Sequence, residues 1–293
     1  MLVEVGERRL DIEVSGPTDG PVLLYHHGTP GALVQPPGLR TALHERGMRL
    51  VSFSRAGYGS STRLAGRRVA DAAADAAAVL DALEVRRCAV AGWSGGGPHA
   101  LATAALLPDR VSAAILMASV APSDAPDLDF QGGMGEDNQQ EFGAARRGEA
   151  ALRPFLEAQV PGLVGGDPES VVAAMRSLLP EVDQTAFTDD FASFLLASFR
   201  EGLGSGVDGW VDDDLAFLQP WGFDLAAPAR HGIPVFVWQG GVDLMVPAAH
   251  GAWLADHIPG SVPHLEPHDG HLTIVVGAVD RMVAELVEHG GRD

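Results

Sequence analysis

Residues 88–107 read CAVAGWSGGGPHALATAALL, and this stretch decides the fold. The apolar run from Cys88 predicts a buried strand, and the alanine-rich run after Gly96 predicts a helix. Between them, residues 92–96 fit G-x-S-x-G, a sharp strand-to-helix turn that holds Ser94 in strained backbone geometry. Glycines at positions 92 and 96 leave room for this turn, because a Cβ there would meet the neighbouring strand and helix.

Strands and helices alternate on both sides of this turn. We expect strands at residues 2–5, 10–14, 22–26, 50–53, 88–92, 111–117, 234–239 and 261–266. Helices are expected at residues 36–46, 69–83, 96–107, 250–257 and 273–289. This alternation predicts an α/β fold with a mostly parallel eight-stranded sheet and helices on both faces.

Residues 122–229 interrupt the alternation. Loops rich in Asp, Gly and Pro surround helical patches near residues 141–159, 168–179 and 189–201. Because the strand–helix pattern resumes afterwards, this block predicts a helical cap inserted after the sixth strand. The expected division is a core of residues 1–121 and 230–293 around a cap of residues 122–229.

The charge of the chain is strongly acidic. Its 293 residues include 39 acids and 20 bases, all arginine, for a net charge of −19. Residues 124–229 hold 20 acids and five arginines, which is −15 of that total. An acidic surface repels nucleic acid and anionic membranes, so we expect neither as a partner.

The remaining composition favours a cytoplasmic protein. The N-terminus lacks a signal-peptide pattern, and no apolar run is long enough to cross a bilayer. The single cysteine, Cys88, lies in an expected buried strand, where it reads as a core residue rather than a reactive thiol. The expected partner is a small-molecule substrate, and the sequence leaves a monomer and a homodimer equally open.

The chemistry expected at Ser94 requires a base and an acid from later loops. A serine hydroxyl is a weak nucleophile at neutral pH and needs a base within hydrogen-bond reach. His271 follows the last expected strand and is preferred to His268 in the same loop, because Gly270 gives the loop freedom to turn the imidazole inward. Asp243 follows a glycine turn and is the expected acid that orients the base. Asp124, after the strand that ends near residue 117, is the alternative acid.

The negative charge of a tetrahedral intermediate needs N–H donors aimed at it. Gly95, next to the serine, supplies one amide. The loop His26-His27-Gly28-Thr29-Pro30-Gly31 follows the first expected parallel strand, and we expect Thr29 to supply the other amide through its backbone. The two histidines are expected to shape this loop rather than to act as the base.

These motifs together resemble the successive signatures of the α/β-hydrolase superfamily, most closely its capped esterase and proline-iminopeptidase-like branch. The resemblance rests on residues 27–31, 54–61, 92–97, 241–243 and 270–271, and covers residues 20–120 and 230–290. It implies a Ser94–His271–Asp243 triad, with no cofactor and no metal. In relatives the position of Ser54 is commonly Asp, so the usual partner of Arg55 is altered here.

Several activities fit this triad. The leading hypothesis is a carboxylesterase acting on a small to medium, neutral, largely apolar ester through an acyl-enzyme. A proline-iminopeptidase-like aminopeptidase, a carbon–carbon hydrolase or a perhydrolase would use the same groups, and an aminopeptidase would need cap carboxylates to hold a substrate ammonium. Gly95 stands where iminopeptidases usually carry a bulky aromatic residue. A non-catalytic ligand-binding receptor is the alternative from another class.

Aromatic residues of the cap and core are the candidates for the substrate pocket. An aromatic stripe at Phe187, Phe191, Phe194, Leu195 and Phe199 has helical spacing and faces either the serine or the sheet. Trp210, Trp221 and Phe223 flank the return to the core, where they would line the entrance. The expected pocket residues are His27, Trp93, Phe191, Phe194, Trp210 and Trp221.

Overall fold

The computed structural model describes residues 1–290 and contains one eight-stranded sheet, which confirms the predicted fold. Its strand order is β1-β2-β4-β3-β5-β6-β7-β8. The strands are β1 (Leu2–Val5), β2 (Arg8–Ser15), β3 (Val22–His26), β4 (Arg49–Phe53), β5 (Cys88–Trp93), β6 (Val111–Met117), β7 (Val235–Gly240) and β8 (Val262–Glu266).

The sheet is parallel from β4 to β8. The first two strands run antiparallel, with β1 paired to β2 and β2 paired to β4. Strand β5 lies near the centre between β3 and β6, and all six of its residues are buried. The turn that contains Ser94 therefore begins at the carboxyl end of a central strand, where parallel sheets place their ligand sites.

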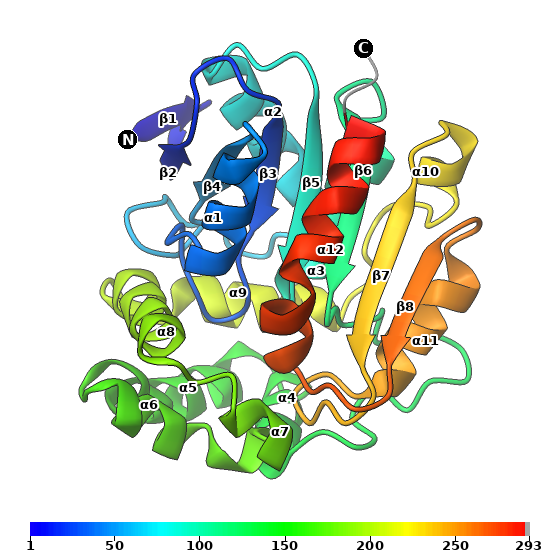
Figure 1. Cartoon of the computed structure of the whole chain (residues 1–293). Helices are drawn as coiled ribbons and strands as arrows, with labels where there is room; N and C mark the ends of the chain where they lie inside the picture. Colours follow the sequence, from blue (N-terminus) through cyan, green and yellow to red (C-terminus); the bar gives the residue numbers. More distant parts are fainter. Residues whose placement is uncertain (291–293) are drawn as a thin grey trace.

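Five helices cover the two faces of the sheet. Helices α1 (Pro37–Glu45) and α12 (Thr273–Gly290) pack together on the face towards the viewer in Figure 1. The other face carries α2 (Ala72–Ala82), α3 (Gly96–Leu106) and α11 (Ala248–His257), and a 3₁₀ turn at Val69–Asp71 precedes α2. Each of these core helices begins and ends within three residues of the range that the sequence predicts.

Of the seven helices between β6 and β7, the first six form a layer across the carboxyl ends of the parallel strands (Figure 1). They are α4 (Glu136–Ala145), α5 (Glu149–Val164), α6 (Pro168–Ala174), α7 (Glu181–Gln184), α8 (Asp189–Leu203) and α9 (Asp208–Phe217), with a 3₁₀ turn at Arg176–Leu178. The short α10 (Ala227–Arg230) then leads into β7. This helical insertion is hereafter called the cap.

The cap differs in detail from the sequence prediction. One expected helical patch, residues 141–159, is divided into α4 and α5 by Gly148, whose φ of +93° breaks the helix. Helix α9 lies outside the three predicted helical patches, and it contains three consecutive aspartates, residues 212–214. All three are buried.

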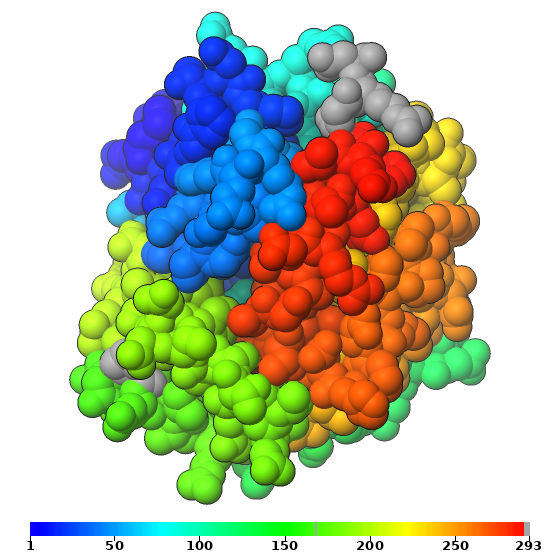
Figure 2. Space-filling model, in the orientation of Figure 1, coloured from blue at the N-terminus to red at the C-terminus, as the bar shows by residue number. Residues whose placement is uncertain are grey.

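The cap packs directly against the core. In Figure 2 its atoms form the lower part of the face shown and meet the atoms of the C-terminal segment above them. Within residues 1–290, no helix combines the length and apolar character needed to cross a bilayer. Burial of Cys88 in β5 raises the pKa of its thiol to about 12, so this group stays protonated at neutral pH.

Candidate active site

Ser94 lies at a tight turn between β5 and α3. Its φ is +56°, a left-handed conformation that costs a non-glycine residue about 1 kcal/mol or more. A Cβ at Gly92 would overlap the carbonyl oxygen of Gly96, and a Cβ at Gly96 would overlap that of His26. The Ser94 amide donates to Met117 O at 2.8 Å, which ties the turn to β6. The glycines at both ends of the motif are therefore required by direct backbone contact.

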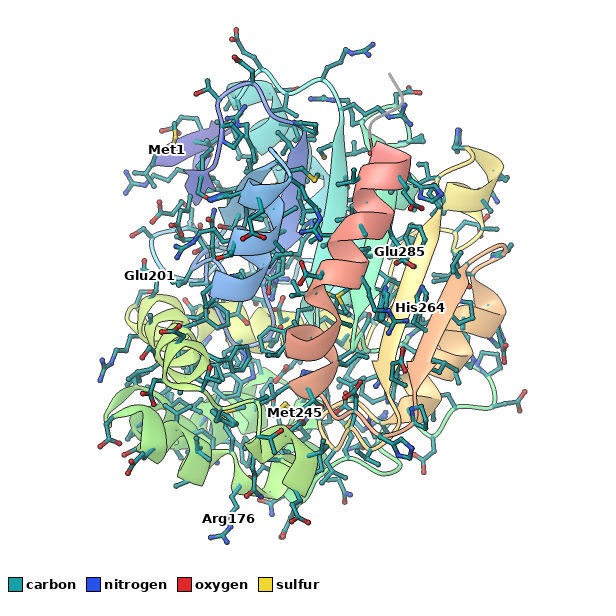
Figure 3. The ribbon with its side chains drawn as sticks, viewed as in Figure 1. Met1, Arg176, Glu201, Met245, His264 and Glu285 are labelled. Atoms are coloured by element: carbon teal, nitrogen blue, oxygen red, sulfur yellow. The ribbon has the colours of Figure 1, made fainter. Side chains whose placement is uncertain are left out.

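His271 and Asp243 are joined by a buried hydrogen bond. His271 Nδ1 lies 2.8 Å from Asp243 Oδ2, and the two side chains are 1% and 0% exposed. The same carboxylate accepts from the amides of Met245 and Val246 at 2.8 and 2.9 Å, and from Gln239 Nε2 at 3.1 Å. In Figure 3, Met245 lies between the cap and the lower end of α12.

These contacts determine the tautomer of His271. Asp243 is surrounded by donors, so it is the acceptor of the hydrogen bond with His271, and His271 Nδ1 carries the hydrogen and donates. The other ring nitrogen, Nε2, is then the basic one. The alternative base, His268, and the alternative acid, Asp124, are both exposed, whereas His271 and Asp243 are buried.

Ser94 and His271 line one cavity of about 250 Å³ beneath the cap. Thr29 and Gly95 line it as well, and a Cβ at Gly95 would overlap the Thr29 side chain, so the two loops touch. In residues 1–290 the amides of Thr29 and Gly95 donate to no protein acceptor. A hydroxyl, an imidazole and two residues whose amides have no protein acceptor among residues 1–290 thus line the same cavity.

The loop that carries Thr29 is held by a charged residue of the cap that the sequence analysis missed. Asp213 of α9 accepts hydrogen bonds from Thr29 Oγ1 at 2.6 Å and Tyr58 OH at 2.8 Å. Its oxygens also lie 2.6 Å from Arg55 Nη2 and from Arg67 Nη2. All of these charged groups are buried. Asp213 is therefore the partner of Arg55 that the resemblance left unassigned.

Burial alone would raise the pKa of Asp213, but the adjacent guanidinium groups of Arg55 and Arg67 hold the pKa well below its usual range. The carboxylate is thus ionised at neutral pH. No sequence pattern predicts this contact, because Asp213 is 158 residues from Arg55 and lies in a run of three aspartates.

The buried histidines near Ser94 support the loops around it. His27 Nδ1 donates to Gly28 O at 2.7 Å, while its Nε2 accepts from the Arg55 amide at 3.1 Å. His99 Nδ1 lies 2.8 Å from Gly95 O. Burial first, and the positive charge of Arg55 second, lower the pKa of both imidazoles well below its usual value. Both rings are therefore neutral supports for the two loops that carry the candidate amides.

Four of the six expected pocket residues line the cavity, namely His27, Trp93, Phe194 and Trp210. Phe191 instead packs against the Trp93 ring, with centroids 6.2 Å apart, and lines a neighbouring cavity under α1 and α12. Trp221 stacks on Phe223, and its carbonyl oxygen accepts a hydrogen bond from the Ala70 amide. Trp221 therefore lies where the cap contacts the core. Trp221 and Phe223 were expected to line the entrance, but neither of them lines this cavity.

Two carboxyl groups of the cap also line the cavity. Glu141 accepts a hydrogen bond from Trp210 Nε1 at 2.7 Å, and the neighbouring Asp214 is 1% exposed. Burial first, and repulsion by Glu141 second, raise the pKa of Asp214 well above its usual range, and burial raises the pKa of Glu141. The two carboxyl groups therefore repel each other whenever both are ionised.

Metal-binding side chains are not gathered anywhere in the described chain. Within residues 1–290, no group of three or more His, Cys, Asp or Glu side chains is arranged to hold a metal ion. The Glu141–Asp214 pair offers two carboxyl groups only, fewer than the three protein ligands of a typical catalytic zinc site.

Comparison with known proteins agrees with this architecture. The chain is 25% identical over 280 residues to the uncharacterized hydrolase YcgS of Bacillus subtilis, covering 90% of this chain and 88% of the relative. It is 35% identical over 109 residues to a bifunctional esterase/perhydrolase of Acinetobacter calcoaceticus, covering 36% of this chain and 40% of that protein. An alpha/beta hydrolase fold protein from Nakamurella multipartita has a similar structure, with a TM-score of 0.66 at 25% identity and 99% of both chains covered. The alpha/beta hydrolase fold family matches residues 21–278, and the chain belongs to this family.

Proposed function

We propose that this hydrolase cleaves small, neutral carboxylic esters through an acyl-enzyme on Ser94. The observation that carries the proposal is the 2.8 Å bond between His271 and Asp243, at the wall of the cavity that Ser94 lines. A base in this tautomer can accept the proton of a serine hydroxyl, and the carboxylate stabilises the imidazolium that results. The esterase/perhydrolase of Acinetobacter calcoaceticus, similar over about a third of the chain, supports the same reaction class.

In the first half of the proposed reaction, Ser94 Oγ attacks the ester carbonyl carbon while its proton moves to His271 Nε2. The carbonyl oxygen becomes an oxyanion, which accepts hydrogen bonds from the Thr29 and Gly95 amides. The carbon–oxygen bond to the leaving group then breaks. The departing alcohol takes the proton from His271, and the acyl group stays on Ser94.

In the second half, water attacks the acyl carbon and gives its proton to His271 Nε2. The second tetrahedral intermediate uses the same two amides. Its collapse breaks the bond to Ser94 Oγ, which recovers the proton from His271 and releases the carboxylic acid. No further co-reactant is needed, since water supplies both the hydroxyl group of the acid and the proton of the alcohol.

The size and lining of the cavity favour a short, uncharged acyl group. A volume of about 250 Å³ is small for a ligand pocket, for which roughly 300–1,000 Å³ is usual. Phe194, Leu195 and Phe199 supply apolar wall, and the Glu141–Asp214 pair repels a substrate carboxylate.

A panel of p-nitrophenyl esters tests this proposal. We expect kcat/KM to be highest for acyl chains of two to about six carbons, and to fall at least about tenfold for an acyl chain of equal length that ends in a carboxylate. Initial rates of p-nitrophenol release measure both, at low salt and with spontaneous hydrolysis subtracted. Folded enzyme that turns over none of the esters would contradict the proposal.

The Glu141–Asp214 pair favours a second candidate, a hydrolase of substrates that carry an amine. A buried carboxyl pair is costly unless a ligand or proton compensates its charge. In residues 1–290, neither oxygen of Asp214 accepts a hydrogen bond from a protein donor, so a substrate ammonium in the cavity would find a free acceptor there.

Substitution of Asp214 separates the two candidates. If the pair holds an ammonium group, Asp214→Asn should lower kcat/KM for aminoacyl p-nitroanilides by about tenfold or more and leave short neutral esters within about twofold. If the enzyme is a neutral esterase, wild type should show no measurable anilide activity. Glu169→Gln, an exposed cap variant with the same change of charge, is the control for nonspecific electrostatic effects.

A further inference from the structure

A carboxylate of the cap is bonded to the segment that carries His271. Asp183, on α7, is fully buried. Its Oδ2 accepts from the His271 amide at 2.8 Å. Its Oδ1 accepts from the amides of Leu272 and Thr273 at 3.0 and 2.9 Å, and from Thr273 Oγ1 at 3.0 Å. One side chain thus binds three consecutive amides, which lie 88–90 residues further along the chain.

These amides form the N-terminus of α12, which begins at Thr273. The first amides of a helix have no partner within the helix, and the helix dipole makes this end positive. A neighbouring Ser, Thr, Asp or Asn normally satisfies them. Here the carboxylate comes from the cap, and α7 lies beside the start of α12 in Figure 1.

Gly270 has a clear role in this contact. A Cβ at that position would come within 2.5 Å of the Asp183 carboxyl atoms. The φ of Gly270 is not in the left-handed region, so space rather than backbone freedom requires glycine here. From the sequence, Gly270 was expected to let the loop turn the imidazole inward; in the structure it leaves room for a side chain of the cap.

We propose that Asp183 is a positioning residue for His271, so that the cap completes the active site when it is seated on the core. This inference rests on the proposed function of His271 as the base. Asp183 does not touch the imidazole or the cavity; it holds the backbone on both sides of the His271 Cα. Since Asp243 binds only the ring, the two carboxylates constrain His271 at different points. A cap that moved away would take the carboxylate from these three amides and leave the imidazole held by Asp243 alone.

The test compares Asp183→Asn with Glu181→Gln, an exposed residue of the same helix with the same change of charge. In Asp183→Asn we expect kcat for p-nitrophenyl acetate to fall about 10- to 100-fold, because a displacement of about 1 Å costs up to about 100-fold in rate. KM should stay within about twofold, and Asp183→Glu should restore part of the rate. Labelling of Ser94 by a fluorophosphonate should slow by the same factor as kcat. Glu181→Gln should match wild type in all of these measurements.

A double-mutant cycle shows whether Gly270 acts through Asp183. Gly270→Ala should lower kcat in the wild-type background and have a smaller effect when combined with Asp183→Ala, because the obstructed carboxylate is then absent. Circular dichroism and a thermal melt give the folded fraction of each variant, and kcat is expressed per folded molecule.

The inference is overturned if kcat per folded molecule of Asp183→Asn stays within about twofold of wild type, or if only KM changes. It is also overturned if the Gly270→Ala effect is the same in both backgrounds. A failure of the proposed function looks different, since wild-type enzyme would then hydrolyse no ester or Ser94→Ala would remain active.

Discussion

Ser94→Ala is expected to lower kcat for a short p-nitrophenyl ester by about a thousandfold or more, with little change in stability. The substitution removes the only hydroxyl that lies at the G-x-S-x-G turn, beside the cavity that His271 lines. Binding and the two amides remain, and these alone leave residual catalysis in enzymes of this type. Alanine occupies less space than serine, so the buried contacts of the turn are kept.

Steady-state kinetics and a thermal melt of the same preparation measure both parts of this expectation. Ser60→Ala, a change at an exposed serine, is the control and should match wild type. If Ser94→Ala kept more than about a tenth of the activity, another group would have to carry the acyl transfer.

Asp213→Asn is expected to destabilise the protein by about 3–5 kcal/mol, because breaking a buried ion pair leaves uncompensated charge. Two buried guanidinium groups, those of Arg55 and Arg67, lie 2.6 Å from this carboxylate. The Thr29 hydroxyl loses its charged acceptor in the same change, so the loop that presents the Thr29 amide loosens. We therefore expect kcat to fall as well.

Chemical denaturation at pH 7 measures the loss of stability of Asp213→Asn. Asp212→Asn is the matched control on the same helix, since its partner Arg63 is 28% exposed and has further carboxylates beside it. The control should cost less than Asp213→Asn, because the cation it leaves is partly exposed and keeps other carboxylates as partners. Equal costs for the two variants would show that the charge of Asp213 is not what the core depends on.

The difference in stability between wild type and Asp213→Asn should depend on pH in a defined direction. The pKa of Asp213 is lower in the folded protein than in the unfolded chain, so its contribution is complete at neutral pH. It is lost only as the pH falls below about 4, the ordinary pKa of aspartate, towards the lower folded value. The stability difference between wild type and Asp213→Asn should therefore be constant from pH 6 to 8 and shrink in acid.

Local patterns explain why the sequence predicted so much of the core. The apolar run of β5 and the glycines at 92 and 96 are consecutive in the chain, so the motif is recognisable without coordinates, although Gly96 makes room for His26 O of another strand. The same holds for His271, which follows the last strand, and for Asp243, which follows β7. The carboxyl ends of parallel strands meet at one edge of the sheet, and this topology brings the two loops together.

The cap was harder to predict because its important contacts are long-range. Asp183 and Asp213 satisfy backbone amides and arginines that are about 90 to 160 residues away. In the sequence, both belong to a segment whose excess of acids resembles a solvated surface. Burial and partners determine what each of these aspartates does, and neither is encoded in local spacing. The acidic cap is therefore partly an internal scaffold for the Thr29 and His271 loops.

The most direct test of the account is to label the enzyme with a fluorophosphonate and map the modified peptide. We predict that wild type is modified at Ser94, that His271→Ala slows the labelling by at least about a hundredfold, and that His268→Ala labels at the wild-type rate. Modification of a different residue, or equal labelling rates for wild type and His271→Ala, would contradict the proposed site.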